Sequence, residues 1–285
     1  MKILVTGGTG FIGSSLISKL VEDDKNEVYC LDNYFTGQAN QHEGRVQYFA
    51  GSTNDIDKLI HFVPDIIYHL GEYSRISTSF DDVDKLWQLN IDGTFQVLQF
   101  CVEHNVKLVY AGSSSIFGNN GEDQHLTPYS WAKAKMVELI KNYGDWYGLD
   151  YAIAYFYNIY GPRQISDGKY ATVIGIFEEQ FRSGEPITIV SPGTQKRYFT
   201  HVEDAVTGLI KVGEHGEGDG YCLCDENSLF SIKEVAEMFS NDLVYLEEQK
   251  GNRKDPVIIS DRCKTELGWR TKNKLTDYIN KIKRI

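Results

Sequence analysis

The sequence lacks any long apolar run. No stretch approaches the roughly 20 consecutive apolar residues that a membrane-spanning helix requires, so an integral membrane protein is not expected. The chain opens with Met-Lys-Ile-Leu-Val-Thr-Gly-Gly and runs directly into a glycine-rich motif, which leaves no room for a signal peptide. These two absences predict a cytoplasmic protein without a membrane partner.

Basic residues are also scarce. Lys and Arg total 29 against 40 Asp and Glu, which gives a formal net charge of −11 at pH 7. Their one concentration, at 272–284, is typical of the solvated face of a last helix. The sequence shows no other basic cluster that could bind along a phosphate backbone, so no nucleic-acid partner is expected. A small anionic ligand would have to be bound by a few well-placed cations.

Cysteine is infrequent, and its spacing excludes the usual metal motifs. Five cysteines are present, and Cys222 and Cys224 form only a C-x-C pair. We therefore expect reduced, mostly buried thiols and no metal site. The 285 residues, 41% of them hydrophobic, are enough for a nucleotide-binding domain plus a smaller lobe.

Short β-branched runs alternate with helical patterns through the first half of the chain. Strands are predicted at 2–6, 27–31, 46–50, 65–70, 106–112 and 151–155, with the main helices at 11–21, 81–104 and 128–147. Such alternation predicts parallel βαβ units and hence an α/β fold with a doubly wound Rossmann sheet. Glycines, prolines and short strands at 187–190 and 221–223 follow. We predict a dinucleotide-binding domain at 1–160, interleaved with a smaller C-terminal α/β substrate lobe at 161–285.

A glycine-rich turn lies where the first strand meets the first helix. Gly7, Gly10 and Gly13 have the spacing G-x-x-G-x-x-G, which allows a tight turn and a close approach of the backbone to a pyrophosphate. The helix N-terminus then offers unpaired N–H groups to the anion. Asp32, at the end of the second strand, can accept hydrogen bonds from ribose hydroxyls and would repel a 2′-phosphate. The pattern favours NAD over NADP.

Three polar residues downstream predict hydride-transfer chemistry. Tyr129 and Lys133 lie one turn apart on a predicted helix that opens after Pro128. A lysine ammonium favours the phenolate of a neighbouring tyrosine, which can then act as a base near neutral pH. Ser113 ends the fifth strand, at the sheet edge where ligands bind, and its hydroxyl can hold the reacting oxygen.

The chain resembles the extended short-chain dehydrogenase/reductases that act on nucleotide sugars, which include 4-epimerases, 4,6-dehydratases, decarboxylases and reductases. The resemblance covers nearly the whole chain. Its motifs are TGGTGFIG, Asp32 in LDNYFTG, His69-Leu70, Asn90 in LNIDGT, Ser113, Tyr129 with Lys133, Asn158 in YNIYGPRQ, and the stretch 197–204.

The resemblance implies an NAD cofactor, a nucleotide-diphosphate sugar as substrate and a role in polysaccharide biosynthesis. It implies a homodimer formed by the helices at 81–104 and 128–147. The expected cofactor-binding residues are Gly7, Gly10, Phe11, Ile12, Gly13, Asp32, Asn33, Ser52, Thr53, Leu70, Gly71, Asn90, Tyr129 and Lys133. The expected substrate-binding residues are Tyr73, Ser114, Asn158, Arg197 and Arg253. The two arginines would meet the diphosphate and Asn158 the sugar or a phosphate.

Several positions depart from the family pattern. Dehydratases carry an acid pair where this chain has Ser114 and Ser115, and the decarboxylases also carry an acid nearby, so both reactions are disfavoured. After His69 the chain reads Leu-Gly-Glu-Tyr-Ser-Arg, where the family more often has alanines. Glu72, Tyr73 and Arg75 are thus candidates to line the nicotinamide or sugar region, although Tyr73 fits simple packing equally well.

These observations predict a nucleotide-sugar 4-epimerase that oxidises the sugar at C4 and returns the hydride to the opposite face. A 4-dehydrogenase that releases the 4-keto sugar would use the same residues and remains an alternative. A 4-keto-sugar reductase is disfavoured because Asp32 opposes NADPH. A non-catalytic NAD sensor is disfavoured because such proteins commonly lack the Tyr/Lys pair. The nucleotide and the sugar stay open.

Overall fold

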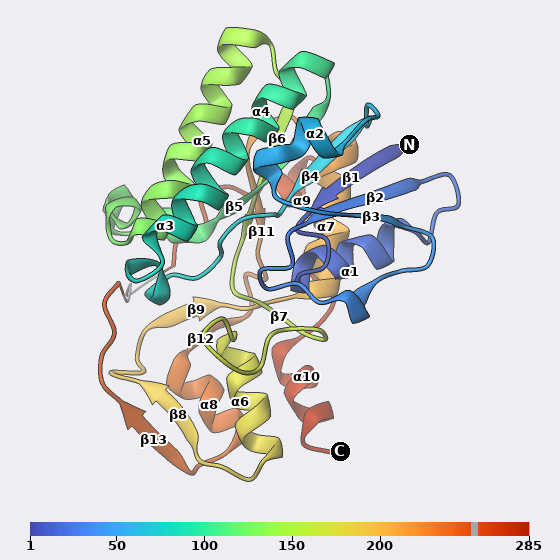
Figure 1. Ribbon diagram of the computed structural model, residues 1–285. Coiled ribbons are helices and arrows are strands. Elements are labelled where there is room, and N and C mark those ends of the chain that lie inside the picture. Colours follow the sequence, from blue (N-terminus) through green and yellow to red (C-terminus); the bar gives the residue numbers. More distant parts are fainter. Residues whose placement is uncertain (252–255, 285) are drawn as a thin grey trace.

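The computed structural model describes residues 1–251 and 256–284, and its core is a seven-stranded parallel sheet (Figure 1). The strand order is β11-β6-β5-β4-β1-β2-β3. The strands are β1 (Lys2–Thr6), β2 (Glu27–Asp32), β3 (Gln47–Ala50), β4 (Ile66–His69), β5 (Lys107–Ser113), β6 (Tyr151–Phe156) and β11 (Gly218–Leu223). The predicted α/β Rossmann fold is therefore confirmed.

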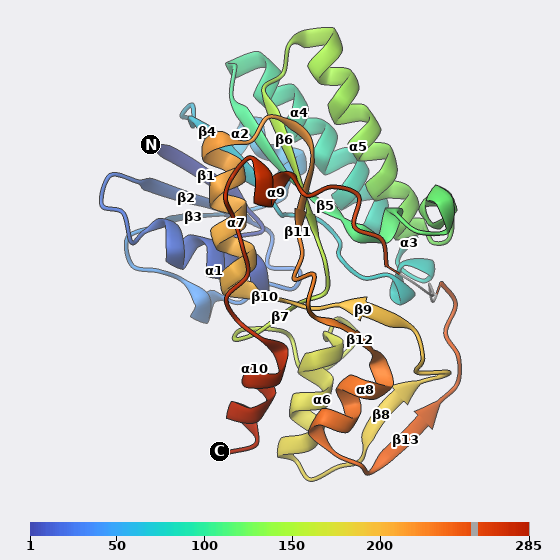
Figure 2. The same ribbon diagram turned by 180° about the vertical axis from the view of Figure 1, so that it is seen from behind.

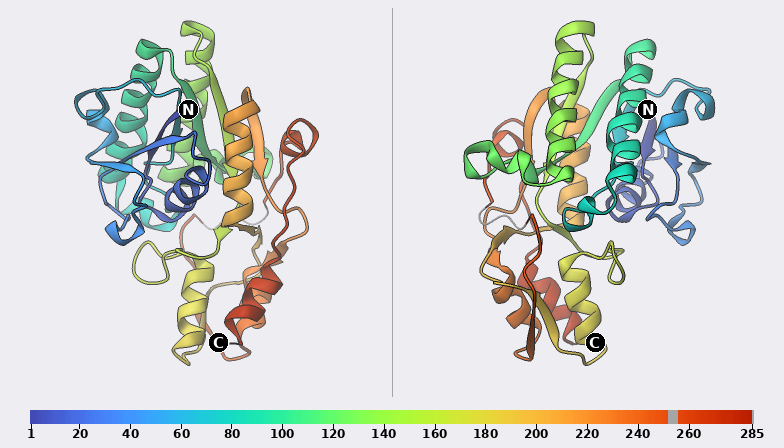
Figure 3. Two further views of the ribbon diagram at one scale, coloured as in Figure 1. Left: turned by 90° about the vertical axis from the view of Figure 1, so that its right-hand side faces the viewer. Right: turned by 60° about the vertical axis from the view of Figure 1, so that its left-hand side comes forward.

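Helices cover both faces of this sheet, as the two side views in Figure 3 show. On one face lie α1 (Phe11–Leu20) and α7 (Val202–His215), and on the other α2 (Ile56–Leu59), α4 (Gly93–His104) and α5 (Pro128–Tyr147). Successive residues of one strand supply the two cores: Leu4 packs with the α4 and α5 side, and Ile3 with the α1 and α7 side. Because each strand is buried on both faces, its sequence is an almost unbroken apolar run.

A smaller lobe lies beyond the carboxyl ends of the strands (Figures 1 and 2). Its strands are β8 (Ile187–Val190), β9 (Lys196–Tyr198), β12 (Leu229–Ser231) and β13 (Leu243–Leu246), and its helices α6 (Val173–Arg182), α8 (Ile232–Phe239) and α10 (Leu275–Ile282). Phe177, Ile189, Phe239 and Leu275 belong to its separate hydrophobic core. The short strands β7 (Ile159–Tyr160) and β10 (Thr200–His201) pair in parallel between the lobes.

The chain returns from the smaller lobe to the main sheet. β11 pairs with β6, and α7 packs against α1, although both lie after residue 160. The short strand expected at 221–223 is thus the edge of the Rossmann sheet and not part of the smaller lobe. Local sequence pattern identifies a strand, but it carries no information about the sheet to which that strand pairs. α9 (Arg262–Thr265) also packs beside β11.

The helix expected at 81–104 is divided in three. α3 (Val83–Leu86) leads into a π-helical segment, η4 (Trp87–Asp92), before α4 begins at Gly93. Such π segments frequently accompany functional sites because they turn a side chain out of register. Here the segment contains Asn90, which is fully buried.

Two expectations from composition can be compared with the structure. All five cysteines are buried and free of disulfides, and burial raises the pKa of the Cys30 and Cys222 thiols. Of the helices in the described part of the chain, none combines the length and the apolar character needed to cross a membrane.

Candidate active site

A cavity of about 790 Å³ lies between the carboxyl ends of the strands and the smaller lobe. It brings together most of the residues that the sequence predicted for cofactor, chemistry and substrate. Those lining it are Gly7, Gly10, Phe11, Ile12, Gly13, Asp32, Asn33, Thr53, Leu70, Gly71, Ser113, Ser114, Tyr129, Lys133, Asn158 and Arg197.

The glycine-rich turn forms one end of the cavity. Gly7 has φ +70, and a Cβ added there would lie 2.7 Å from the carbonyl oxygen of Leu70, so the tight turn requires glycine. Helix α1 begins directly afterwards, and its N-cap Gly10 supplies no side-chain hydrogen bond. The first N–H groups of a helix lack partners within the helix. They therefore suit an anionic group such as a pyrophosphate.

Asp32 and Thr53 lie at the same end. The two Asp32 carboxylate oxygens accept hydrogen bonds from the N–H groups of Thr9, at 2.9 Å, and Tyr34, at 2.7 Å. The hydroxyl oxygen of Thr53 is buried and has no hydrogen-bond partner among the described residues. A fixed carboxylate, an unpaired hydroxyl and a glycine turn with no room for Cβ fit the adenosine and pyrophosphate of a dinucleotide. We find that these residues fit NAD.

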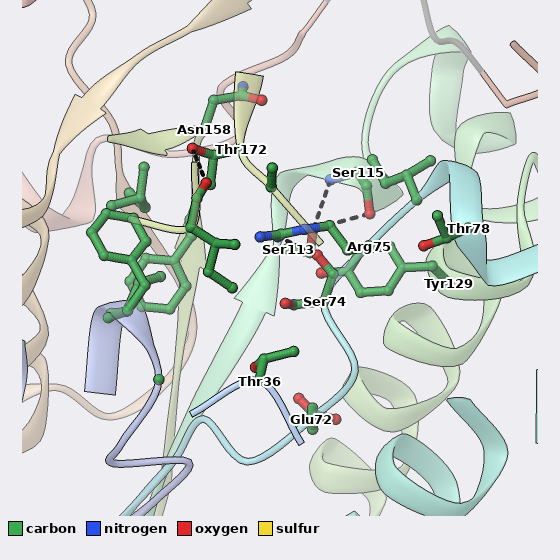
Figure 4. Close-up of a pocket in the computed structure, with 18 of the residues that line it drawn as sticks. Thr36, Glu72, Ser74, Arg75, Thr78, Ser113, Ser115, Tyr129, Asn158 and Thr172 are labelled. Atoms are coloured by element: carbon green, nitrogen blue, oxygen red, sulfur yellow. Dashed lines mark hydrogen bonds between the residues drawn. The ribbon is translucent and has the colours of Figure 1, made fainter. Parts of the chain in front are cut away.

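The other end of the cavity contains the predicted reacting residues. Thr127 caps α5 by accepting a hydrogen bond from the Ser130 N–H at 3.0 Å, and Pro128 occupies the first helical turn. This start puts Tyr129 and Lys133 on one helix face at the cavity wall. No hydrogen bond to the Tyr129 hydroxyl is found within the described residues, and Figure 4 shows the ring beside Ser113 and Ser115.

Ser113 is the last residue of β5. Its hydroxyl donates to the Ser115 hydroxyl at 3.0 Å and accepts from the Ser115 N–H at 3.3 Å. The strand end and this turn fix the Ser113 oxygen on the cavity wall. The next two residues, Ser114 and Ser115, also line the cavity, and neither carries a carboxylate.

Lys133 is held by an acid whose role the sequence left open. Its ammonium donates to the Glu72 carboxylate and, at 2.6 Å, to the carbonyl oxygen of Ala111. The two side chains are 5% and 2% exposed, so this is a buried ion pair. Glu72 Oε1 also accepts hydrogen bonds from Tyr110, at 3.0 Å, and Thr94, at 2.9 Å. Both Glu72 oxygens are therefore occupied.

His69 connects this ion pair to the first strand. Its Nδ1 lies 2.7 Å from the Thr6 hydroxyl and its Nε2 2.9 Å from the Thr94 hydroxyl. Because Thr94 donates to Glu72, it accepts from Nε2–H, which assigns the neutral tautomer with Nδ1 as acceptor. Burial lowers the pKa of His69 to about 4, with Glu72 opposing and Lys133 assisting the shift.

Three predicted contact residues lie behind the cavity wall. Asn90 accepts a hydrogen bond from the Tyr73 N–H at 2.7 Å and donates to the Tyr73 carbonyl at 3.0 Å. The Tyr73 ring is buried, and its hydroxyl bonds to Thr78 at 2.5 Å and to Asp82 at 3.0 Å. Ser52 accepts from the Asn54 N–H and caps a short 3₁₀ helix. Thus Tyr73 packs, and together with Asn90 it holds the loop that carries Glu72.

Loops that follow strands of the main sheet, together with the smaller lobe, supply the remaining wall. Asn158 has φ 35, and its side-chain amide donates to the Tyr198 carbonyl at 3.0 Å. Arg197, on β9, donates to the Lys196 carbonyl at 2.6 Å and lines the cavity. Arg253 lies outside the described residues. Arg75, for which the sequence offered no definite role, also lines the cavity.

The prediction of no metal site stays a prediction. Among the described residues, one group brings three possible metal-binding side chains together, namely Asp57, Glu103 and His104. None of the three lines the cavity, and two of them are exposed.

Residues 3–223 match the NAD dependent epimerase/dehydratase family, and the chain belongs to this family. NAD is the family's cofactor, in agreement with the fit of the glycine turn, Asp32 and Thr53. UDP-glucuronic acid decarboxylase 6 of Arabidopsis thaliana is 30% identical over 97% of this chain and 86% of the relative. A putative UDP-glucose 4-epimerase of Methanocaldococcus jannaschii is 28% identical over 98% and 96% of the two chains.

Solved structures show the same fold. The crystal structure of the UDP-glucose 4-epimerase of Thermotoga maritima with UDP-glucose matches with a TM-score of 0.89 at 24% identity. The match covers 98% of this chain and 96% of that one. The relatives therefore include both epimerases and decarboxylases, and the chemistry of this chain has to be argued from its own residues.

Proposed function

We propose that this chain is an NAD-dependent nucleotide-sugar 4-epimerase. The observation that carries the proposal is the placement of acids in the cavity. Among the described residues that line it, the only carboxylates are Asp32 and Glu72. Asp32 lies at the glycine-turn end, and both Glu72 oxygens are occupied by Lys133, Tyr110 and Thr94. Of the acids in the described lining, neither is free to protonate a leaving hydroxyl, which favours oxidation and return of the hydride over elimination.

The reacting end then has a defined set of roles. When bound, NAD would supply the hydride acceptor and donor for the sugar C4 carbon. Tyr129, as its phenolate, takes the proton of the C4 hydroxyl, and Ser113 donates a hydrogen bond to the resulting carbonyl oxygen. Lys133, fixed by Glu72 and the Ala111 carbonyl, lines the cavity together with Tyr129. The 4-keto sugar then turns over in the cavity, so that the hydride returns to the opposite face of C4. Tyr129 gives the proton back to the C4 oxygen, and the configuration at C4 is inverted.

The cavity also suits the two parts of such a substrate, with the sugar at the reacting end and the diphosphate at the wall formed by the smaller lobe. Asn158, between β6 and β7, lies across the cavity from Tyr129 in Figure 4, and Arg197 lines the cavity from β9 of the smaller lobe. An arginine fork binds phosphate oxygens in a bidentate manner, so Arg197 is proposed to hold the diphosphate. Ser114 is proposed to contact the sugar. The reacting ring would then lie between Ser113 and Tyr129.

A homodimer is proposed through the helices on one face of the sheet. Trp87, Trp131, Phe95 and Trp146 are 47%, 37%, 41% and 61% exposed, and all lie on the α3–η4–α4 segment or on α5. The Trp87 and Trp131 rings stack at 6.1 Å. Large aromatic side chains gathered on one exposed face are typical of protein interfaces.

The function is tested by releasing and identifying the bound cofactor and then offering a panel of nucleotide sugars. NADH absorbance and product stereochemistry are followed together. A 4-epimer without net NADH supports the proposal. A 4-keto sugar accumulating with NADH would favour a 4-dehydrogenase, and a pentose product would favour decarboxylation.

Variants connect the activity to the site. Tyr129→Phe is expected to lower kcat by roughly 10² to 10⁴ while NAD stays bound. Tyr147→Phe is the matched control, because Tyr147 lies 59% exposed at the far end of the same helix. A Tyr129→Phe protein as active as the control would remove Tyr129 from the mechanism.

A further inference from the structure

Arg75 extends into the cavity from the loop that follows β4. It is half-buried, and its guanidinium donates to two main-chain carbonyls, from Nε to Tyr170 at 2.6 Å and from Nη1 to Ser74 at 3.0 Å. A guanidinium has five N–H donors, so these bonds fix its orientation and leave donors for the cavity.

No acid within the described part of the chain neutralises Arg75. No carboxylate oxygen lies within 4.0 Å of its guanidinium, in contrast to Lys133, paired with Glu72, and Lys169, paired with Asp82. Burial lowers the pKa of Arg75, which reflects the cost of keeping its charge in this place. A cation that is partly removed from water and bound only to neutral carbonyls gains most from an anionic partner.

The position of Arg75 identifies the part of the substrate it would meet. Figure 4 shows its side chain among Ser113, Ser115 and Tyr129, with Asn158 and Thr172 on the other side of the cavity. Arg75, Ser113, Ser115 and Tyr129 all line this one cavity. Arg75 therefore belongs to the reacting end, away from the wall proposed for the diphosphate.

We infer that Arg75 binds a carboxylate on the sugar ring, so that the preferred substrates are nucleoside-diphosphate uronic acids. The inference rests on the proposed function, since it assumes that C4 reacts between Ser113 and Tyr129. In a hexuronic acid the carboxylate is attached to C5, the carbon next to C4. An arginine beside the residues that act on C4 is thus in reach of that group, and its planar fork matches a carboxylate.

The test compares matched acidic and neutral ligands by calorimetry. All titrations use NAD-loaded protein carrying Tyr129→Phe, which slows turnover during the measurement. The ligand pairs are UDP-glucuronic acid with UDP-glucose, and the same two sugars on dTDP, so that the nucleotide does not decide the result. Arg75→Gln and Arg75→Lys are compared with Arg45→Gln, an exposed arginine paired with Asp24 outside the cavity.

The acidic member of a pair is expected to bind roughly 10- to 100-fold more tightly than the neutral one. Arg75→Gln removes this preference while changing neutral-sugar affinity by less than about threefold. Arg75→Lys retains part of the preference, because it keeps the charge but loses the fork. Arg45→Gln leaves it unchanged.

Three results would overturn the inference: equal affinity for the two members, no binding of the acidic member on either nucleotide, or an equal loss for both members in Arg75→Gln. The last would assign Arg75 to the diphosphate or to its loop. Turnover by the protein with Tyr129 intact is measured separately. Tighter binding of the acidic sugar without epimer formation would refute the epimerase proposal and keep the role of Arg75. Epimer formation without tighter binding of the acidic sugar would keep the epimerase proposal and refute the role of Arg75.

Discussion

The Lys133 ammonium is paired with the Glu72 carboxylate beneath the reacting end of the cavity. The lysine of the predicted Tyr/Lys pair is therefore in direct contact with a buried acid. Lys133 is consequently held in one place by the Glu72 carboxylate and the Ala111 carbonyl before any ligand binds.

Glu72→Gln is expected to destabilise the protein by about 3 kcal/mol, because it leaves the buried Lys133 charge without its partner. kcat is expected to fall at least about tenfold as the ammonium moves. Urea unfolding and steady-state kinetics measure the two effects. Glu138→Gln is the control, since its exposed pair with Lys135 contributes at most about 1 kcal/mol. Equal stability of the two variants would contradict a structural role for the buried pair.

Buried His69 makes stability fall in weakly acidic solution. Its folded pKa is about 4 against a usual value of 6.5, so the unfolded chain binds a proton first as the pH falls. The contribution of neutral, buried His69 to the free energy of unfolding is fully present above pH 6.5. It is lost as the pH falls from 6.5 to about 4, and the total loss is near 3 kcal/mol. The unfolding free energy of His69→Gln should therefore change less than that of the wild type between pH 7 and about 4.5. If the free energies of unfolding of the wild type and His69→Gln changed equally with pH, His69 would not titrate in this way.

The fold and much of the cavity could be predicted from sequence. The strands expected at 2–6 and 27–31 match β1 and β2 to within a residue, because parallel strands buried on both faces are marked by continuous apolar runs. The glycine turn and Tyr129 line the cavity, and the sequence pointed to them because a strand-to-helix turn and a helix start are features of local chain geometry. Long-range pairing left no such mark. The pattern predicted a strand at 221–223 and an interleaved second lobe, but it did not predict that β11 pairs with β6.

Side-chain orientation was the other limit. Nothing local distinguishes Glu72, which turns beneath the cavity to meet Lys133, from Arg75, which enters it three residues later. Asn90 and Tyr73 were expected at the ligand, but their mutual hydrogen bonds place them behind the wall. The π-helical segment that carries Asn90 shifts the register of that helix, and a period of 3.6 residues cannot predict such a shift.

Asp32 is expected to set the cofactor preference. Its charge would repel a 2′-phosphate by about 4 kcal/mol at 4 Å for an effective dielectric constant near 20. Asp32→Asn should lower the ratio of the NADP to the NAD dissociation constant by at least about tenfold. Both dissociation constants are measured on protein freed of cofactor. Asp65→Asn, whose carboxylate bonds to the Lys2 N–H, is the control. An unchanged preference in Asp32→Asn would place the discrimination elsewhere.

The exposed tryptophan pair gives a test of the proposed dimer. Trp87→Glu puts a charge on the face formed by α4 and α5, and should shift the protein from dimer to monomer in light scattering. Tyr245→Glu, at a 49% exposed tyrosine on β13, should leave the mass unchanged. A Trp87→Glu protein that stays dimeric would show that these helices do not form the interface.

The most direct test of the epimerase follows the hydrogen at the sugar C4. A nucleotide sugar carrying deuterium at C4 is incubated with the NAD-loaded protein, and the product is analysed by NMR and mass spectrometry. The account predicts a C4 epimer that retains the deuterium at C4, because the same hydride leaves and returns within one cavity. Loss of the deuterium with release of a 4-keto sugar, or an unreacted sugar across the whole panel, would contradict it.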